Sequence, residues 1–197
     1  MIMREMPIRN VAIFIFDEIE VLDFCGPFEV FVVAGRAGSF DVYTVAEHAS
    51  PIRTRGGMQV IPTYTWDEAP DPHILVVPGG KGTQPLMHHH LTLEWVRATA
   101  TRAEFVLSVC TGALLLAKAG LLDGLTATTH HRSLELLSES APGADVVSDR
   151  RYVDNGKIIT AAGISAGIDA SLHLVERLLG REHAEETAVH MEYDWQG

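Results

Sequence analysis

The chain has few cysteines and no long apolar run. Cys25 and Cys110 are the only two cysteines among 197 residues, which is too few for a disulfide framework and is typical of a reducing compartment. No apolar stretch approaches the length that crosses a bilayer, and residues 1–7 lack the basic start and apolar core of a signal peptide. We therefore expect a soluble cytoplasmic protein with no membrane partner.

Basic residues are also scarce. Lys and Arg number 15 against 26 Asp and Glu, which gives a formal net charge of -11, and no basic stripe or cluster is present. Nucleic-acid binding by this chain alone is not expected, because such binding relies on Lys and Arg to neutralise phosphates. The chain also lacks internal repeats, linkers and low-complexity segments, so its length predicts one domain over residues 1–197.

Strand-like and helix-like segments alternate along the chain. Val11–Phe16 and Ile74–Val77 are continuous apolar runs, as in central parallel strands that are covered on both faces. Asn155-Gly156, between two further strand-like segments, is the strongest hairpin signal. The alternation predicts an α/β fold, a flavodoxin-like three-layer sandwich with a mostly parallel central sheet. Functional sites in such sheets lie beyond the carboxyl ends of the strands, where the loops after Phe16, Val77 and Val109 should meet.

A cysteine stands at the junction of a predicted strand and a predicted helix. Cys110 follows an apolar segment, Gly112 leaves room for the helix to start close to the strand, and Gly120 ends that helix. The pattern predicts a nucleophile elbow, a tight turn that holds the side chain over the sheet edge. The amides of the first helical turn would favour a thiolate at Cys110. The alternative is an ordinary buried cysteine.

An acidic residue is the predicted proton carrier for this thiol. Among the acidic residues of the first loop, Asp23 lies between apolar neighbours, so partial burial would raise its pKa and suit it to general acid–base work. The alternative role for Asp23 is to cap a helix predicted from about Pro27 to Ala37, with Pro27 in the first turn.

Two adjacent glycines follow the Ile74 strand. Gly79 and Gly80 permit the close approach and the dihedral angles that let backbone amides face a bound oxyanion. The amide of Thr111, directly after the cysteine, would be a second donor. A Pro-Gly-Gly sequence is otherwise an ordinary turn.

The histidines offer weaker candidates. His88 to His90 are consecutive, so their rings point in different directions and no metal site is expected there; their role stays open. His130 and His131 could approach Cys110 and activate it, or could be surface or core residues. Cys25 is expected to be a small packing residue.

Several of these motifs together resemble the ThiJ/PfpI superfamily, the cysteine branch of the class I glutamine amidotransferase-like fold. Within it, the chain is similar to the isocyanide hydratase group and to the amidotransferase-like domain of AraC-type regulators. The segments that carry the resemblance extend over nearly the whole chain; they are Phe16–Phe31, Val77–Gly80, Ser108–Gly112, Ala117–His130 and Thr160–Asp169.

The resemblance implies roles for individual residues. Cys110 would be the nucleophile, Asp23 would hydrogen-bond its sulfur, and the amides of Thr111 and Gly80 would surround the reacting group. The thiolate would attack the terminal carbon of an isocyanide to give a thioimidate, and water would release an N-substituted formamide without a cofactor. A homodimer is also implied.

The chain departs in two ways from other members of the superfamily, and both departures make some functions less suitable. Protease-like and amidase-like members tend to carry histidine directly after the cysteine, whereas this chain has Thr111, which weakens peptidase and glutaminase interpretations. No segment that could hold a helix-turn-helix is expected beside the domain, and a DNA-binding regulator would need one. The alternative to a hydratase or hydrolase is a non-enzymatic thiol sensor, or a ligand-binding domain related to AraC-type regulators.

Overall fold

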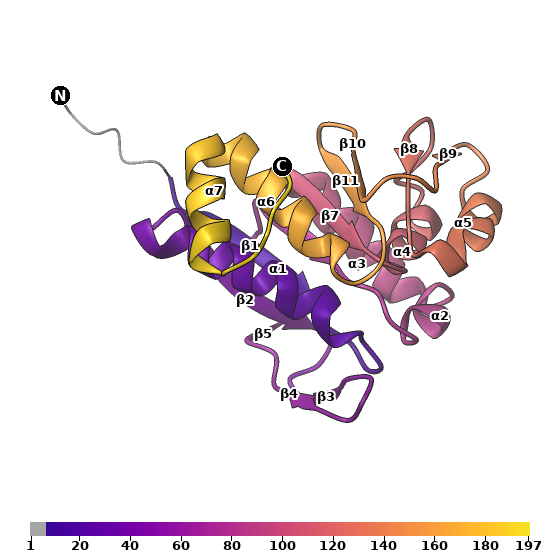
Figure 1. The fold of residues 1–197 in the computed structure, drawn as a ribbon. Helices are drawn as coiled ribbons and strands as arrows, with labels where there is room; N and C mark the ends of the chain where they lie inside the picture. The colour runs from indigo at the N-terminus through magenta and orange to yellow at the C-terminus, as the bar shows by residue number, and fades with distance from the viewer. Residues whose placement is uncertain (1–6) are drawn as a thin grey trace.

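A seven-stranded sheet forms the centre of the computed structural model, which describes residues 7–197 (Figure 1). Residues 1–6, which include most of the segment examined for a signal peptide, lie outside the described part. The strands of the sheet are β1 Arg9–Phe14, β2 Phe40–Ala46, β5 Tyr64–Thr65, β6 Ile74–Val77, β7 Phe105–Val109, β10 Tyr152–Asp154 and β11 Ile158–Ala161. Their order is β10-β11-β7-β6-β1-β2-β5, and only β10 pairs antiparallel to its neighbour.

Helices cover both faces of this sheet. On one face α1 Val21–Ala34, α6 Ala166–Leu179 and α7 Arg181–His190 pack against one another; on the other lie α2 Thr83–Leu86, α3 His90–Arg102, α4 Gly112–Lys118 and α5 Leu134–Ser140 (Figure 1). The smaller elements are 3-10 turns at Gly35–Ala37 and His131–Ser133 and the strand pairs β3 Ile52–Arg53 with β4 Gln59–Val60 and β8 Thr126–Ala127 with β9 Asp145–Val146. The predicted three-layer α/β sandwich is confirmed.

The middle strands are apolar because both of their faces are buried. Every residue of β6 is buried, and so are four of the six in β1 and four of the five in β7. Parallel strands between two helical layers have no solvent-facing side, so their sequences do not alternate between apolar and polar residues. No helix among residues 7–197 is both long enough and apolar enough to cross a membrane.

The first helix begins earlier than the sequence indicated. It starts at Val21, so Pro27 lies inside it and not in its first turn. Proline has no amide proton, so the carbonyl of Asp23 loses its usual helical partner. The side chain of Asp23 does not cap the helix, because Glu20 holds the N-cap position and the Asp23 carboxyl bonds elsewhere. The helix can still pack closely, since a Cβ at Gly26 would lie 3.0 Å from Ile168 of α6.

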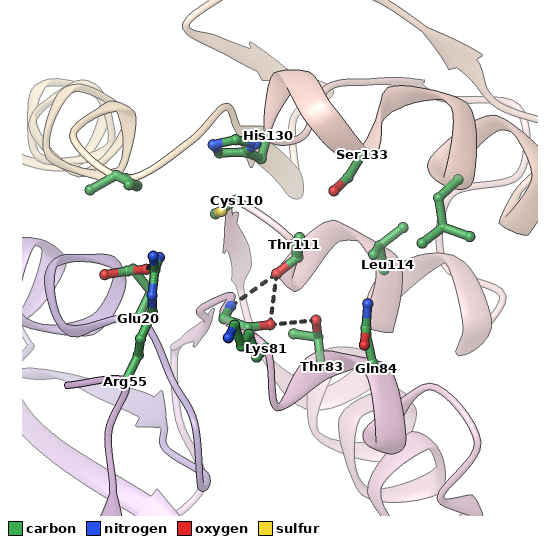
Figure 2. Close-up of a pocket in the computed structure, with 13 residues that line it drawn as sticks. Glu20, Arg55, Lys81, Thr83, Gln84, Cys110, Thr111, Leu114, His130 and Ser133 are labelled. Carbon is green, nitrogen blue, oxygen red and sulfur yellow. Dashed lines mark hydrogen bonds and ion pairs between the residues drawn. The ribbon is translucent and has the colours of Figure 1, made fainter. Parts of the chain in front are cut away.

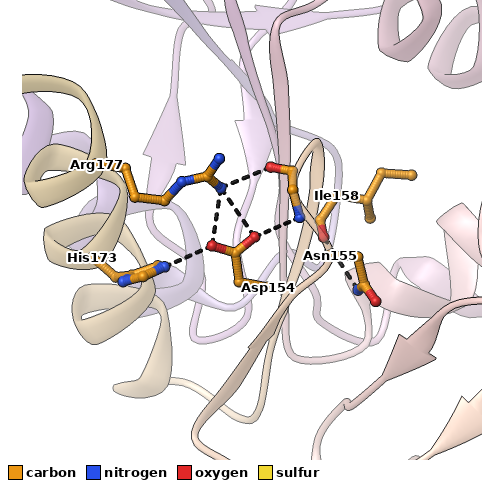
Figure 3. A network of polar contacts seen from close by, with 6 residues as sticks. Asp154, Asn155, Ile158, His173 and Arg177 are labelled. Atoms are coloured by element: carbon orange, nitrogen blue, oxygen red, sulfur yellow. Dashed lines mark hydrogen bonds and ion pairs between the residues drawn. The ribbon is translucent and has the colours of Figure 1, made fainter.

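The predicted hairpin joins β10 and β11 at the sheet end opposite Cys110. The Asp154 carboxylate accepts hydrogen bonds from the Gly156 amide (2.7 Å), His173 Nε2 (2.8 Å) and an Arg177 guanidinium nitrogen (2.9 Å), as Figure 3 shows. Burial alone would raise the pKa of Asp154, but these bonds and the Arg177 charge outweigh it and lower that pKa. The network ties the hairpin to α6.

Candidate active site

Cys110 occupies the predicted elbow between β7 and α4. Its φ of 55° lies in the left-handed region, which costs a non-glycine residue of the order of 1 kcal/mol or more. Neighbouring loops hold this conformation: the Cys110 amide donates to the Ala162 carbonyl (2.9 Å), and Thr129 Oγ1 donates to the Cys110 carbonyl (2.6 Å). A Cβ at Gly112 would overlap the carbonyl of Val77, so glycine is required where the helix leaves the strand.

The first loop rests on the two glycines and so brings Asp23 to the elbow. Ile19 forms a bridge with Gly80, and the Glu20 amide donates to the Gly79 carbonyl (2.9 Å). A side chain at Gly80 would collide with this loop, because a Cβ there would lie 2.5 Å from the carbonyl oxygen of Glu18. The close approach of the two loops places the first turn of α1 against Cys110.

Asp23 is fully buried between Gly79 and Cys110. Its Oδ2 accepts the Gly79 amide at 3.0 Å, and its carboxyl is also hydrogen-bonded with the Cys110 thiol. Its Oδ1 is buried and has no hydrogen-bond partner among residues 7–197. The carboxyl therefore has the sulfur as its polar neighbour on one side and a fixed amide on the other.

Burial raises the pKa of both groups in this pair. It raises the pKa of Asp23 to about 7, against the lowering effect of the Gly79 and Cys110 hydrogen bonds. Burial and then the Asp23 charge raise the pKa of Cys110 to about 12, although the amides of Thr111 and Ile164 donate to the sulfur and lower it. This direction is opposite to the thiolate expected from the helix amides. The pair therefore retains a shared proton near neutral pH, on the sulfur or on the carboxyl.

The two glycine amides already have acceptors within the protein. Gly79 donates to Asp23, and Gly80 donates to Thr111 Oγ1 at 2.9 Å. Thr111 Oγ1 in turn lies 3.3 Å from the Gly80 carbonyl, within hydrogen-bonding distance. These amides hold the proton carrier and the threonine in place, and their expected role toward a substrate oxyanion stays a prediction.

The structure separates the predicted histidines. His130 lines a cavity of about 200 Å³ over Cys110 (Figure 2) and accepts the Arg132 amide through Nδ1 at 3.2 Å. Burial, with the nearby His131 and Arg132 charges, lowers the pKa of His130, which keeps its ring neutral at pH 7. His131 is exposed, its ring lies tilted against that of His130 with the ring centroids 4.2 Å apart, and it does not line the cavity.

The three consecutive histidines lie away from this cavity, around the start of α3. His89 bonds Thr92 Oγ1 (2.8 Å) and His90 lies 3.4 Å from Glu94. Within residues 7–197, no three histidine, cysteine or acidic side chains gather closely enough to hold a metal ion.

Some cavity residues were not found from the sequence. Ile164 lies in the loop between β11 and α6 with a φ of 52°, and its backbone amide donates to the Cys110 sulfur. Arg55 reaches the cavity from the loop between β3 and β4 and pairs with Glu20 (Figure 2). An isoleucine in a left-handed conformation and an arginine in a glycine-rich loop have no local signal that points to a distant thiol.

A parallel α/β sheet with a cysteine elbow, a buried carboxyl partner and a small cavity above them defines a class of cysteine-centred α/β proteins. Residues 9–177 match the model of the DJ-1/PfpI family. The chain belongs to this family.

Two relatives illustrate the range within it. The chain is 37% identical to isonitrile hydratase from Pseudomonas putida over 184 residues, which cover 93% of the chain and 78% of the enzyme. It is 28% identical to the HTH-type transcriptional regulator GbdR of Pseudomonas aeruginosa over 185 residues, 92% of the chain and only 48% of the regulator. The chain thus spans about half the length of that regulator.

A solved structure agrees with these matches. A ThiJ/PfpI family protein from Pseudomonas syringae superposes with a TM-score of 0.88 at 31% identity, covering 98% of this chain and 78% of the other. Both the fold and the family expected from the sequence are confirmed.

Proposed function

We propose that this protein hydrates a small isonitrile to an N-substituted formamide at Cys110. The observation that carries the proposal is the buried pair of Asp23 and Cys110, which retains a shared proton near neutral pH at the base of a small cavity. Such a pair can deliver a nucleophile and an acid at the same moment. The relative named isonitrile hydratase, 37% identical over most of both chains, supports the same reaction.

The reaction then proceeds in two balanced steps. The Cys110 sulfur forms a bond to the terminal carbon of R–N≡C, and a proton from the pair reaches that carbon, which gives a thioimidate, R–N=CH–S–Cys. Water adds its oxygen to the same carbon, one of its protons passes through Asp23 to the nitrogen, and the other stays on the new hydroxyl group. The C–S bond breaks, the hydroxyl proton passes through Asp23 to the sulfur and so restores the thiol, and R–NH–CHO leaves. No oxidant or reductant is consumed.

The surrounding groups have supporting roles in this proposal. The amides of Thr111 and Ile164 stabilise negative charge on the sulfur as the proton leaves. The Gly79 amide fixes the carboxyl. Thr111, held by Gly80, faces the substrate nitrogen, and neutral His130 closes the cavity beside it.

The experiment is an isonitrile assay on the purified chain in water enriched in oxygen-18. We expect cyclohexyl isonitrile to disappear while N-cyclohexylformamide appears with one labelled oxygen. Cys110→Ser should abolish the reaction and Cys25→Ser should leave it unchanged, because Cys25 is half-buried on α1 away from the cavity. Absence of labelled formamide, or equal activity of Cys110→Ser, would reject the proposal.

A ligand-binding role without turnover is the second candidate. The match to the GbdR regulator over 92% of this chain favours it, and the raised pKa of Cys110 suits a thiol that stays protonated. The same raised pKa argues against a peroxide sensor, since oxidation to sulfenic acid proceeds through the thiolate. Saturable binding of an isonitrile with no formamide would identify this second role.

We also propose a homodimer. Leu22 and Val32 are apolar residues of α1 whose side chains are 39% and 41% exposed. Burial against a second copy of the chain would remove them from water. Light scattering should give twice the chain mass of 21.5 kDa. A mass of one chain at all concentrations tested would reject the dimer.

A further inference from the structure

The rim of the Cys110 cavity is positively charged in a chain that is otherwise acidic. Three charged residues line the cavity, Arg55, Lys81 and Glu20, so two positive charges stand against one negative charge. The whole chain has a formal net charge of -11. The lining also includes the buried Leu114 and the partly buried Ile164, which carry no charge. Charge recognition therefore depends on Arg55, Lys81 and Glu20.

Arg55 retains free hydrogen-bonding capacity. Its backbone amide donates to the Ile19 carbonyl at 2.9 Å, which anchors the loop between β3 and β4 over the first loop. Its side chain makes one bond among residues 7–197, from a terminal nitrogen to Glu20 Oε2 at 2.5 Å. A guanidinium has five N–H donors, and this side chain is 57% exposed. The remaining donors can meet a second carboxylate.

Lys81 approaches from a different loop. It directly follows Gly80, is exposed, and forms no ion pair within the part of the chain that the structure describes. Figure 2 shows Lys81 and Arg55 on the same side of the cavity below Cys110, with Glu20 beside Arg55. Both cations are exposed and line the cavity, and among residues 7–197 only Arg55 has an acidic partner.

We propose that Arg55 and Lys81 bind a carboxylate of the substrate, so that the site selects small isonitriles that carry a carboxylate group. The inference rests on the proposed function and names its substrate class. The cavity, at about 200 Å³, is smaller than the roughly 300–1,000 Å³ of sites for drug-sized ligands. The carboxylate and the reacting carbon are then only a few bonds apart. Arg55 offers a planar fork and Lys81 a point charge, while Glu20 competes with the substrate for Arg55.

Two alkylating reagents test charge recognition without requiring turnover. Iodoacetate and iodoacetamide both form an S–CH2 bond to Cys110 as the C–I bond breaks and iodide leaves, but only iodoacetate carries a carboxylate. Thiol ionisation affects both reagents alike, so the ratio of their rates reports recognition of the charge. Cys25 in the same molecule is the internal control, because it lies near the acidic Glu29 and outside the cavity.

We expect Arg55→Gln and Lys81→Gln each to lower the iodoacetate-to-iodoacetamide rate ratio at Cys110 by about three- to fivefold, the upper range for a partly exposed charge pair. Glu20→Gln should raise the ratio, since it frees Arg55 and removes a repelling charge. Peptide mass spectrometry would measure the ratio, and the Cys25 ratio should not move. A general disturbance of the pocket would change both reagents together and leave the ratio constant.

An unchanged ratio in both Arg55→Gln and Lys81→Gln would overturn the inference. A lower rate ratio in Glu20→Gln would also overturn it. So would a folded protein whose Cys110 has not reacted with iodoacetate in the time that urea-unfolded protein needs to react completely. The isonitrile assay separates this failure from failure of the proposed function. A hydratase with equal kcat/KM for isocyanoacetate and its methyl ester would keep the proposed function and lose the carboxylate site.

Discussion

The raised pKa of Asp23 makes its own contribution to the pH dependence of stability, and Asp23→Asn should remove that contribution. The substitution keeps the size of the side chain. Its amide oxygen can still accept the Gly79 amide, which the carboxyl accepts at 3.0 Å, and its NH2 group then faces the Cys110 sulfur as a donor. The variant loses the proton that the carboxyl gains or releases, with the local packing retained.

The magnitude follows from the pKa of Asp23, which rises from 3.8 to about 7 on folding because of burial. Below pH 3.8 the carboxyl is protonated in both the folded and unfolded states, and the stabilisation from the raised pKa is fully present. As the pH rises toward 7, the unfolded chain releases its proton first, and the free energy of unfolding falls. At about 1.4 kcal/mol for each pH unit of difference, the total loss is about 4 kcal/mol. Above pH 7 the loss is complete.

Urea unfolding at pH 4 and at pH 7.5 measures this effect. We expect the wild type to lose about 4 kcal/mol relative to Asp23→Asn between these two values. Asp67→Asn is the matched control, because Asp67 is exposed and should not alter the pH dependence. A difference between wild type and Asp23→Asn that stays constant with pH would show that Asp23 has an ordinary pKa, and would refute the reasoning about the shared proton.

Three further predictions concern the elbow and the hairpin. Asp23→Asn should speed iodoacetamide alkylation of Cys110 about tenfold at pH 7.5, since the carboxylate no longer holds the proton on sulfur. The same variant should slow isonitrile hydration by at least about 100-fold, because the proton carrier is lost. Rates of alkylation and hydration that rise together or fall together would contradict this. Thr129→Val should lower the free energy of unfolding by about 1–3 kcal/mol in urea, because the Cys110 carbonyl loses a buried donor, and Thr129→Ser should restore it. Asp154→Asn should cost about 1 kcal/mol at pH 7, and this difference should vanish as the pH falls through the lowered pKa of Asp154; an equal difference at pH 2.5 and 7 would exclude the charge of His173 and its neighbours as the cause.

The sequence predicted those parts of the fold that depend on local pattern. The strand β6 was predicted with its observed bounds, Ile74–Val77, and Asn155-Gly156 correctly indicated the hairpin. Both signals come from neighbouring residues: a continuous apolar run in one case and a pair of turn-forming residues in the other. The start of α1 was misplaced because Pro27 usually marks a first helical turn. Here the helix tolerates an internal proline, and Asp23 consequently projects from its first turn onto Cys110.

The site was predictable as a set of residues but not as an electrostatic balance. Cys110, Asp23 and Thr111 come together as the family resemblance implied, yet the direction of the thiol pKa was wrong. Donation from the Thr111 amide was foreseeable, whereas the degree of burial depends on how completely the loops around Gly79 close over the carboxyl. Donation from the Ile164 amide depends on a left-handed residue far along the chain, which no local pattern reveals.

The environment of the Cys110 thiol depends on β11, a strand that lies about 50 residues later in the chain. The Cys110 amide and sulfur are held by groups at Ala162 and Ile164, which reach the elbow only after β11 has paired with β7. In the unfolded chain the cysteine is a solvent-exposed thiol with a pKa of about 8.5. In the folded chain it is buried, and burial raises its pKa. An unfolded chain therefore exposes Cys110 to electrophiles and oxidants, whereas in the folded chain burial and the raised pKa of the thiol protect it from them.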